Sequence, residues 1–300
     1  MVKVGLHLPE TERIAPWREL ADICRTAESI GFDSIWVPDH LLYRFPGEEP
    51  TGPWECWSIL SAVAAITSRV EIGPLVLCTN FRNPGLIAKM AATVEEISGG
   101  RLILGLGAGW HQPEYEAFGF PYEERFGRFV EAFTIIRTLL RERAIDFTGR
   151  YYTLRDCEIR PFGPRPEGPP LMIGSRGPQM LAVTLPHVNA WNGWYAWTGN
   201  TVKGYQRLRA EIDSAVEAAG RCPSDVERTM AILLRFPEHD GPVDSRATVI
   251  QGEVELMAEA ITALADAGVG HVQVVLEPCT PEAVDRFGRA IELIRAGTST

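Results

Sequence analysis

The sequence predicts a (β/α)₈ barrel, also called a TIM barrel, that forms a single domain over residues 1–300. Short apolar runs alternate with amphipathic helical patterns along the whole chain, which is typical of parallel βαβ units. With 300 residues and 45% hydrophobic content, the chain is long enough for one such domain and its core. An open doubly wound sheet shows the same alternation, but eight units favour closure into a barrel.

The expected strands are apolar runs bounded by turn residues. In chain order they are residues 2–9, 34–38, 70–78, 102–106, 171–173, 190–194, 230–236 and 271–276. Between them, apolar residues recur at the spacing of a helix. The first such stripe is Trp17, Leu20, Ala21, Cys24 and Ala27, and a late one is Val254, Met257, Ala258 and Ile261. Each stripe predicts a helix that packs one face on the barrel.

Glycines and prolines mark where these elements end. Gly31 and Gly268 each follow a helical stripe and precede a strand, as a left-handed C-cap would. Residues 145–170 interrupt the alternation, because the prolines near their end exclude regular helix and most central strand. These are Pro161, Pro164, Pro166, Pro169 and Pro170. We expect a proline-rich surface excursion there, within the same domain.

Charge and composition exclude several classes of protein. The formal net charge is -10, and no run of Lys or Arg offers a patch for nucleic acid or an anionic membrane surface. The N-terminus has no long apolar stretch, and the longest one elsewhere, residues 59–66, is too short to span a bilayer. The six cysteines form no CxxC pair. We therefore expect a cytoplasmic protein with reduced thiols.

In a barrel the active site is built by the loops that follow the strands. Asp39 and His40 follow the second expected strand, with Tyr43 close behind. His40 is a candidate for proton transfer near neutral pH, with Asp39 beside it. The alternative is an ordinary turn in which Asp39 caps the next segment.

Two other loops are rich in glycine. Gly107, Ala108 and Gly109 follow the fourth strand, where missing Cβ atoms permit close approach of a planar ligand. The spacing is not that of a dinucleotide fingerprint. Residues 174–177 follow the fifth strand and read Gly174, Ser175, Arg176 and Gly177. Backbone N–H groups and Arg176 could hold a phosphate there, or the segment is a plain turn before a helix.

Tryptophans also gather near the predicted mouth of the barrel. With Tyr43, the candidates for an aromatic cavity are Trp54, Trp110, Trp191 and Trp194. Core packing would explain one or two of them, and the rest favour a large planar cofactor and an apolar substrate. We expect no metal, because HxxxH and HExxH are absent, and no hydrolytic nucleophile of the GxSxG type.

Several segments, in order, resemble the bacterial luciferase-like monooxygenase family, and especially its branch that uses the deazaflavin coenzyme F420. They are residues 31–40, 81–84, 98–102, 105–110, 114, 118–119, 125–131, 149–152 and 173–174. The resemblance covers nearly the whole chain and implies a barrel, usually a homodimer, with a flavin or deazaflavin ring at its mouth.

The same resemblance implies roles for individual residues. Leu75 and Val76 match a bulge in the third strand, often a non-prolyl cis peptide, that supports the back of the ring. Residues 107–109 match the loop beside the cofactor tail, and residues 174–177 match the phosphate-binding turn. Asp39 and His40 match the pair beside the reactive face of the ring. His7 is carried over as a further cofactor contact.

The expected function is hydride transfer between coenzyme F420 and a small, largely apolar organic substrate. The cofactor would carry the chemistry while the protein orients the reactants and excludes water. Two alternatives use the same motifs, namely an FMN-dependent monooxygenase and a non-catalytic protein that sequesters a flavin. A metal-dependent barrel hydrolase would require a bound metal in the purified protein.

Overall fold

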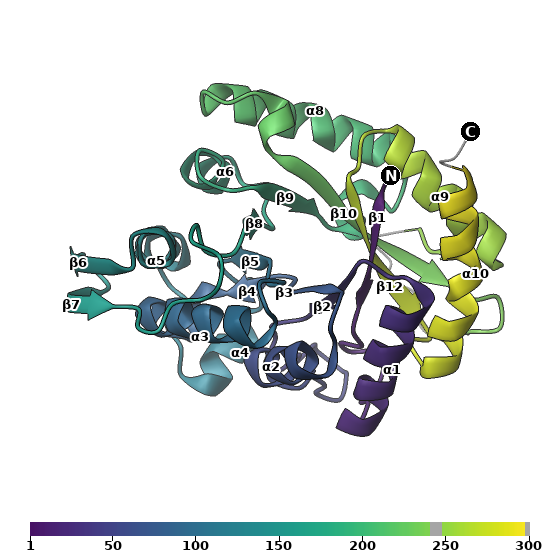
Figure 1. Ribbon diagram of the computed structural model, residues 1–300, viewed down its shortest axis with the longest axis horizontal. Coiled ribbons are helices and arrows are strands. Elements are labelled where there is room, and N and C mark those ends of the chain that lie inside the picture. The colour runs from purple at the N-terminus through teal and green to yellow at the C-terminus, as the bar shows by residue number, and fades with distance from the viewer. Residues whose placement is uncertain (241–247, 298–300) are drawn as a thin grey trace. The chain divides into compact units, whose positions relative to one another are not determined.

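The computed structural model describes residues 1–240 and 248–297 (Figure 1). The chain divides into two compact units, which are taken here in turn. Unit 1 comprises residues 1–36, 69–71 and 172–300, and unit 2 comprises residues 37–68 and 72–171. Within the described ranges no helix is long and apolar enough to cross a membrane. A single domain over residues 1–300 stays a prediction.

Unit 1 is built on a parallel sheet whose central strand is β12. Its strands pair in the order β2, β1, β12, β10, β9 and β8, and β11 pairs with β10. In chain order they are β1 (Lys3–His7), β2 (Ser34–Val37), β8 (Leu171–Ile173), β9 (Ala190–Gly193), β10 (Glu227–Arg235), β11 (Ile250–Gln251) and β12 (His271–Glu277). Figure 1 shows β12 between β1 and β10. The six long apolar runs predicted in this unit are therefore confirmed as strands.

The helices of unit 1 carry the predicted apolar stripes. They are α1 (Trp17–Ile30), α6 (Pro178–Thr184), α7 (Tyr195–Thr198), α8 (Val202–Ala218), η2 (Pro223–Asp225), α9 (Val254–Asp266) and α10 (Pro281–Gly297). All four stripe residues of α9 are buried. In α1 the expectation for Trp17 was wrong: it is the first residue of the helix and is 40% exposed, while the rest of its stripe is buried. Gly31 ends α1 in the left-handed conformation, at φ 103°.

Unit 2 contains the remaining helices and strands. They are α2 (Cys56–Ile66), β3 (Glu71–Pro74), β4 (Leu77–Cys78), η1 (Thr79–Phe81), α3 (Pro84–Ile97), β5 (Leu104–Gly107), α4 (Gln112–Phe118), α5 (Arg125–Glu142), β6 (Ala144–Thr148) and β7 (Thr153–Glu158). The single strand expected over residues 70–78 is divided into β3 and β4 by a cis peptide bond between Leu75 and Val76, where the resemblance places one. Beyond it, β4 pairs with β5 in parallel.

The excursion contains an element that the sequence did not predict. Residues 144–158 form an antiparallel hairpin of β6 and β7, visible beside α5 in Figure 1. The side chains of both strands are exposed or only half-buried. Half-buried residues alternate with exposed ones, as Ile145 and Phe147 do with their exposed neighbours, but the runs are short and none of their residues is fully buried. They were therefore not recognised as strands beside the prolines that follow. The prolines follow the hairpin, as residues 161–170.

Buried polar side chains of β2 and β12 form a chain of hydrogen bonds in unit 1. The indole N–H of Trp36 donates to Ser34 Oγ at 2.7 Å, and Ser34 Oγ lies 2.7 Å from Nε2 of His271. Burial lowers the pKa of His271 to about 3, and the nearby Lys3 adds to this effect. The imidazole is therefore neutral in the folded protein at neutral pH.

We expect His271 to make stability depend on pH. The unfolded chain protonates this histidine near its usual pKa of 6.5, and the folded chain does so only near 3. The free energy of unfolding should therefore fall as pH drops from about 6.5, by up to about 1.4 kcal/mol per pH unit from this one group. Denaturant titrations at several pH values measure the slope. It should be shallower in His271→Gln, and an equal slope in both proteins would exclude His271 as its source.

Candidate active site

His40 lies after β2, and a carboxylate holds its ring in place. Nδ1 of His40 is 2.9 Å from Oε1 of Glu114, whose side chain is fully buried in the first turn of α4. The other oxygen, Oε2, accepts the backbone N–H of Leu41 at 2.9 Å. Because a carboxylate accepts the Nδ1 proton, Nε2 becomes the basic atom of the ring. The arrangement suits a histidine that moves a proton.

Asp39 has a different environment from its neighbour His40. Its carboxylate is buried and receives two hydrogen bonds of 2.8 Å from the guanidinium of Arg82, as well as the backbone N–H of Cys78 at 2.8 Å. Arg82 also donates to Glu55 at 2.6 Å. With both oxygens so engaged, Asp39 holds the segment after β2 against β4 and η1. Its predicted direct part in catalysis stays a prediction.

Glu55 completes this ion-pair network from the start of α2. It is the N-cap of α2 and accepts the backbone N–H groups of Trp57 and Ser58. Burial alone would raise the pKa of Glu55, but hydrogen bonds from Ser58 and Arg82 outweigh it and hold the pKa below its usual value. The pKa of Arg82 is raised, because Asp39 and Glu55 outweigh the effect of burial. Glu55 and Arg82 are therefore charged across the neutral pH range.

The glycine-rich loop after β5 packs on two buried side chains. The backbone of Gly109 has φ 70°, and a Cβ atom there would lie 2.4 Å from the hydroxyl of Tyr115 and 2.6 Å from Sγ of Cys78. The Tyr115 hydroxyl donates to the carbonyl of Ala108. Asn80 donates to the same carbonyl at 3.0 Å. Gly109 is thus required by protein packing, and the carbonyl of Ala108 is held from two sides.

Aromatic side chains surround His40 within unit 2. The rings of Tyr43 and Trp110 lie 4.5 and 5.7 Å from the His40 ring, centroid to centroid. Tyr43 is buried, whereas Trp110 is 52% exposed. Trp54, the third aromatic residue predicted here, is 53% exposed. Tyr43 and Trp110 are therefore next to His40, and their part in binding a substrate stays a prediction.

His7, Trp191 and Trp194, which were also predicted for the site, lie in unit 1. His7 ends β1 and is buried, with its ring 5.8 Å from that of Trp194, which precedes α7. Trp191 is fully buried in β9, and its indole N–H donates to the carbonyl of Ser175 at 2.7 Å. Trp191 thus supports the turn after β8 and offers no exposed face to a substrate in this structure.

The turn after β8 comprises Gly174, Ser175, Arg176 and Gly177 and leads into α6. The N–H of Gly177 donates to Ser175 Oγ at 3.2 Å, and Gly177 is the residue before the helix. Arg176 is exposed, and its guanidinium lies 5.8 Å from the centre of the Trp197 ring. Because α6 has only 7 residues, its dipole is small, and Arg176 would supply most of the positive charge for an anion.

Sequence reasoning did not find several side chains of the site, among them Glu55, Arg82, Glu114 and His111. Arg82 and Glu114 belong to segments of the family resemblance, but nothing in the sequence pairs Arg82 with Asp39 or Glu114 with His40. The partners are 43 and 74 residues apart. His111, beside Trp110, accepts the backbone N–H of Arg44 at 3.1 Å. An acidic residue in the first turn of a helix after a strand-end loop is the one signal that could have pointed to Glu114.

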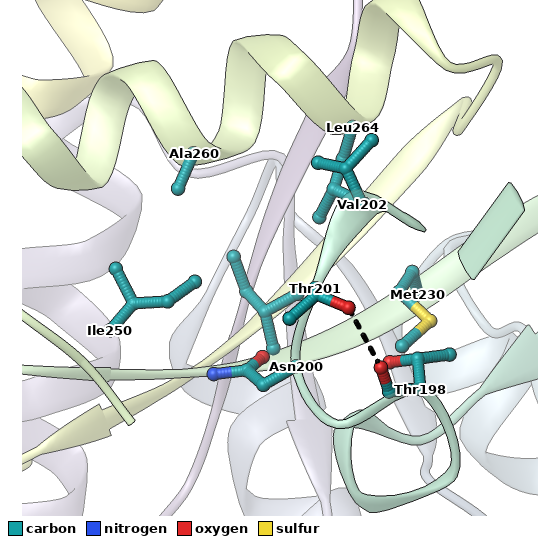
Figure 2. Close-up of a pocket in the computed structure, with 9 residues that line it drawn as sticks. Thr198, Asn200, Thr201, Val202, Met230, Ile250, Ala260 and Leu264 are labelled. Atoms are coloured by element: carbon teal, nitrogen blue, oxygen red, sulfur yellow. Dashed lines mark hydrogen bonds between the residues drawn. The ribbon is translucent and has the colours of Figure 1, made fainter. Parts of the chain in front are cut away.

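A small cavity elsewhere in unit 1 is too small to hold a cofactor. Figure 2 shows it beside β10, with Met230 and Leu264 among its lining. Its volume is about 40 Å³, whereas ligand pockets are typically about 300–1,000 Å³. Its polar side chains bond within the protein, as Thr201 does to the carbonyl of Thr198 at 3.0 Å. We assign no ligand to it.

Comparison with known proteins identifies the family. Residues 2–269 match the sequence model of the luciferase-like monooxygenases. The chain belongs to the luciferase-like monooxygenase family. This confirms the resemblance noted in the sequence, and the chain is an oxidoreductase of the luciferase-like class.

Individual members of the luciferase-like family give further detail. An F420-dependent glucose-6-phosphate dehydrogenase from Amycolatopsis mediterranei (strain U-32) is 37% identical over 244 residues, which are 79% of this chain and 70% of that protein. An F420-dependent secondary alcohol dehydrogenase, in complex with an F420-acetone adduct, has a similar structure, with a TM-score of 0.81 at 21% identity over 98% of this chain and 99% of that one.

A flavin enzyme has nearly the same fold. Riboflavin lyase, solved with modified FMN and riboflavin, has a TM-score of 0.80 at 13% identity, over 99% of this chain and 92% of that one. At such identities the two structural likenesses establish the fold alone. They confirm the predicted (β/α)₈ barrel of the luciferase-like family.

Proposed function

We propose that this protein is an F420-dependent oxidoreductase that interconverts an alcohol and a carbonyl group, with His40 as the acid and base. The observation that carries the proposal is the hydrogen bond between His40 and the fully buried Glu114, which leaves Nε2 as the basic atom of the ring. The names of its relatives support both the cofactor and the reaction, since they are F420-dependent dehydrogenases.

The residues of unit 2 are suited to hold a cofactor. Oγ of Thr79 and Oδ1 of Asn80 are buried and have no hydrogen-bond partner in the described part of the chain. Both follow β4, whose last residue pairs with Gly107 of β5. Buried polar atoms without partners are costly, and a polar ligand group would satisfy them. We propose that these two atoms and residues 107–109 bind the cofactor beside the Leu75–Val76 peptide.

F420 supplies hydride transfer, which the side chains of a protein cannot perform. The protein handles the proton. When a carbinol carbon loses hydride, Nε2 of His40 would accept the proton of its hydroxyl group, and the Glu114 carboxylate would stabilise the imidazolium that forms. In the opposite direction His40 would return that proton to the carbonyl oxygen. Tyr43 and Trp110 would exclude water and contact the apolar part of the substrate.

FMN is the alternative cofactor, because riboflavin lyase, which was solved with modified FMN, has a similar fold. Reduced FMN reacts with oxygen, so an FMN enzyme of this fold would be a monooxygenase. The two cofactors are distinguished by binding and by the need for oxygen during turnover. A cytoplasmic homodimer stays a prediction.

Turnover by a panel of alcohols tests the proposed function. The purified protein would be incubated with oxidised F420 and, separately, with glucose 6-phosphate and with secondary alcohols of increasing chain length. We expect loss of the deazaflavin absorbance with at least one of them, with or without oxygen. A protein that binds F420 but reduces it with none of the panel, and that turns over only with FMN and oxygen, would refute the proposal.

Arg176 provides a test of the predicted phosphate site. Arg176→Ala should weaken F420 binding by about 1.5–3 kcal/mol, the range for hydrogen bonds to a charged group, and leave kcat at saturating cofactor unchanged. The difference should shrink at high salt, because Arg176 is exposed. Dissociation constants at low and high ionic strength measure this, with the surface variant Arg289→Ala as the control. Equal affinity of both variants would show that Arg176 does not contact the cofactor.

A further inference from the structure

His111 has a conformation that helix capping does not explain. It is the residue before α4, but its side chain makes no capping hydrogen bond, and histidine is a poor N-cap. The imidazole is 4% exposed, and Nε2 accepts the backbone N–H of Arg44 at 3.1 Å. Nε2 must be unprotonated to accept this bond, so the ring is neutral with its proton on Nδ1.

His111 and the first turn of α4 both accept backbone N–H groups of the segment after His40. Glu114, three residues further on, accepts the N–H of Leu41. Beyond Arg44 the chain turns back, because Tyr43 and Thr51 form an antiparallel bridge with N–H···O distances of 2.7 and 3.1 Å. The loop of residues 44–50 is therefore closed at its base by this bridge and by His111.

Exposed aromatic rings lie on both sides of His111. Its ring is 5.1 Å from that of Phe45 and 5.2 Å from that of Trp110. Phe45 is 39% exposed and Trp110 is 52% exposed. Phe45 also stacks on Tyr43, at 5.9 Å, and Tyr43 in turn contacts His40. A chain of ring contacts thus runs from His40 through the buried Tyr43 to Phe45, and Trp110 contacts His40 and His111.

We propose that His111 is a positioning residue, which holds Phe45 and Trp110 as the surface that binds an apolar group of the substrate next to His40. The proposal rests on the proposed function, since it assigns the substrate side of the same site. It adds Phe45 as a residue that determines substrate specificity. His111 acts on Phe45 indirectly, by accepting the hydrogen bond of the Arg44 amide next to it. Substrates with an alkyl or ring group beyond the reacting carbon should benefit from it.

The contact should also respond to pH. Burial lowers the pKa of His111, Glu114 opposes this, and His40 adds to it. The charged or titratable groups near the ring include Glu114 and His40, the phenol of Tyr43, whose ring lies 5.4 Å away, and the exposed Arg44. Protonation of Nε2 at acid pH would remove the acceptor of the Arg44 N–H and place a positive charge against it. The loop of residues 44–50 should then open more often at its base. An acceptor that does not titrate, in place of His111, would prevent this.

Amide exchange of Arg44, resolved by NMR, is the direct test. His111→Phe should lower the protection of the Arg44 amide against exchange by about 3- to 10-fold, the equivalent of one hydrogen bond. The protection of the Leu41 amide should not change, because that N–H donates to Glu114. His111→Gln retains an acceptor that does not titrate, so the Arg44 amide should stay protected at acid pH in this variant. In the wild type its protection should fall at acid pH, once the exchange rates are corrected for the intrinsic effect of pH. If His111→Phe does not fold, this comparison alone decides the contact.

Kinetics test the role in substrate binding. His111→Phe and Phe45→Ala should raise the KM for the longest secondary alcohols of the panel by about 3- to 10-fold, with little change for 2-propanol or in kcat. Unchanged Arg44 exchange in His111→Phe, or lost protection with an unchanged KM, would overturn the proposal. If no panel alcohol is turned over, the proposed function fails, and Arg44 exchange still decides whether His111 holds the loop.

Discussion

Replacing His40 by alanine is expected to lower kcat by about 10²–10⁴-fold, the usual contribution of a general acid or base. The buried carboxylate of Glu114 accepts the Nδ1 proton of His40 and leaves its Nε2 as the basic nitrogen. The His40 side chain is partly exposed and contributes little to core packing, so the variant should still fold. F420 affinity should change much less than kcat. Steady-state kinetics and cofactor titration of the same preparation measure both quantities.

Two further variants separate proton transfer from general damage. Glu114→Gln keeps a hydrogen-bond acceptor beside Nδ1 but removes the negative charge, so it should lower kcat by a smaller factor than His40→Ala. His239→Ala, which changes a histidine in the other unit, should leave kcat unchanged. A His40→Ala protein with the kcat of the wild type would remove His40 from the mechanism.

Replacing Arg82 by methionine is expected to destabilise the fold by about 3–5 kcal/mol, because it leaves a buried carboxylate without its partner. Arg82 donates twice to Asp39 and once to Glu55, and the Asp39 side chain is fully buried. Urea or thermal unfolding measures the change. Arg289→Met, whose arginine makes an exposed ion pair with Glu292, should change stability by less than about 1 kcal/mol.

The double variant Asp39→Asn with Arg82→Met separates the lost pair from lost packing. The amide oxygen of asparagine can still accept the N–H of Cys78, and no charge is left buried, so part of the stability should return. If the single variant Arg82→Met is as stable as Arg289→Met, Asp39 is not held by a structural ion pair, and a catalytic role for it becomes tenable again.

The barrel could be predicted because its strands are buried on both faces and therefore appear as apolar runs. The strand expected over residues 171–173 matches β8 at both ends. By contrast, β10 begins at Glu227, three residues before its expected start at Met230. The added residues are polar, and Arg228 is buried through an ion pair with Asp213 that a local pattern does not reveal.

The site was predictable one residue at a time but not as a set of contacts. A histidine after a strand pointed to His40, and the resemblance pointed to the cis peptide at Leu75 and Val76. The orientation of His40 depends on Glu114, 74 residues away, which only the fold brings near. Trp191 was expected near the mouth of the barrel and in contact with a ligand, whereas the folded chain buries it completely within β9.

Equilibrium titration of the purified protein with F420 and, separately, with FMN tests the central claim most directly. Quenching of tryptophan fluorescence would report binding, since exposed Trp110 lies beside His40. The account predicts saturable F420 binding at a concentration well below that needed for FMN. Tight binding of FMN together with no detectable binding of F420 would contradict it and assign the protein to flavin-dependent oxygenation.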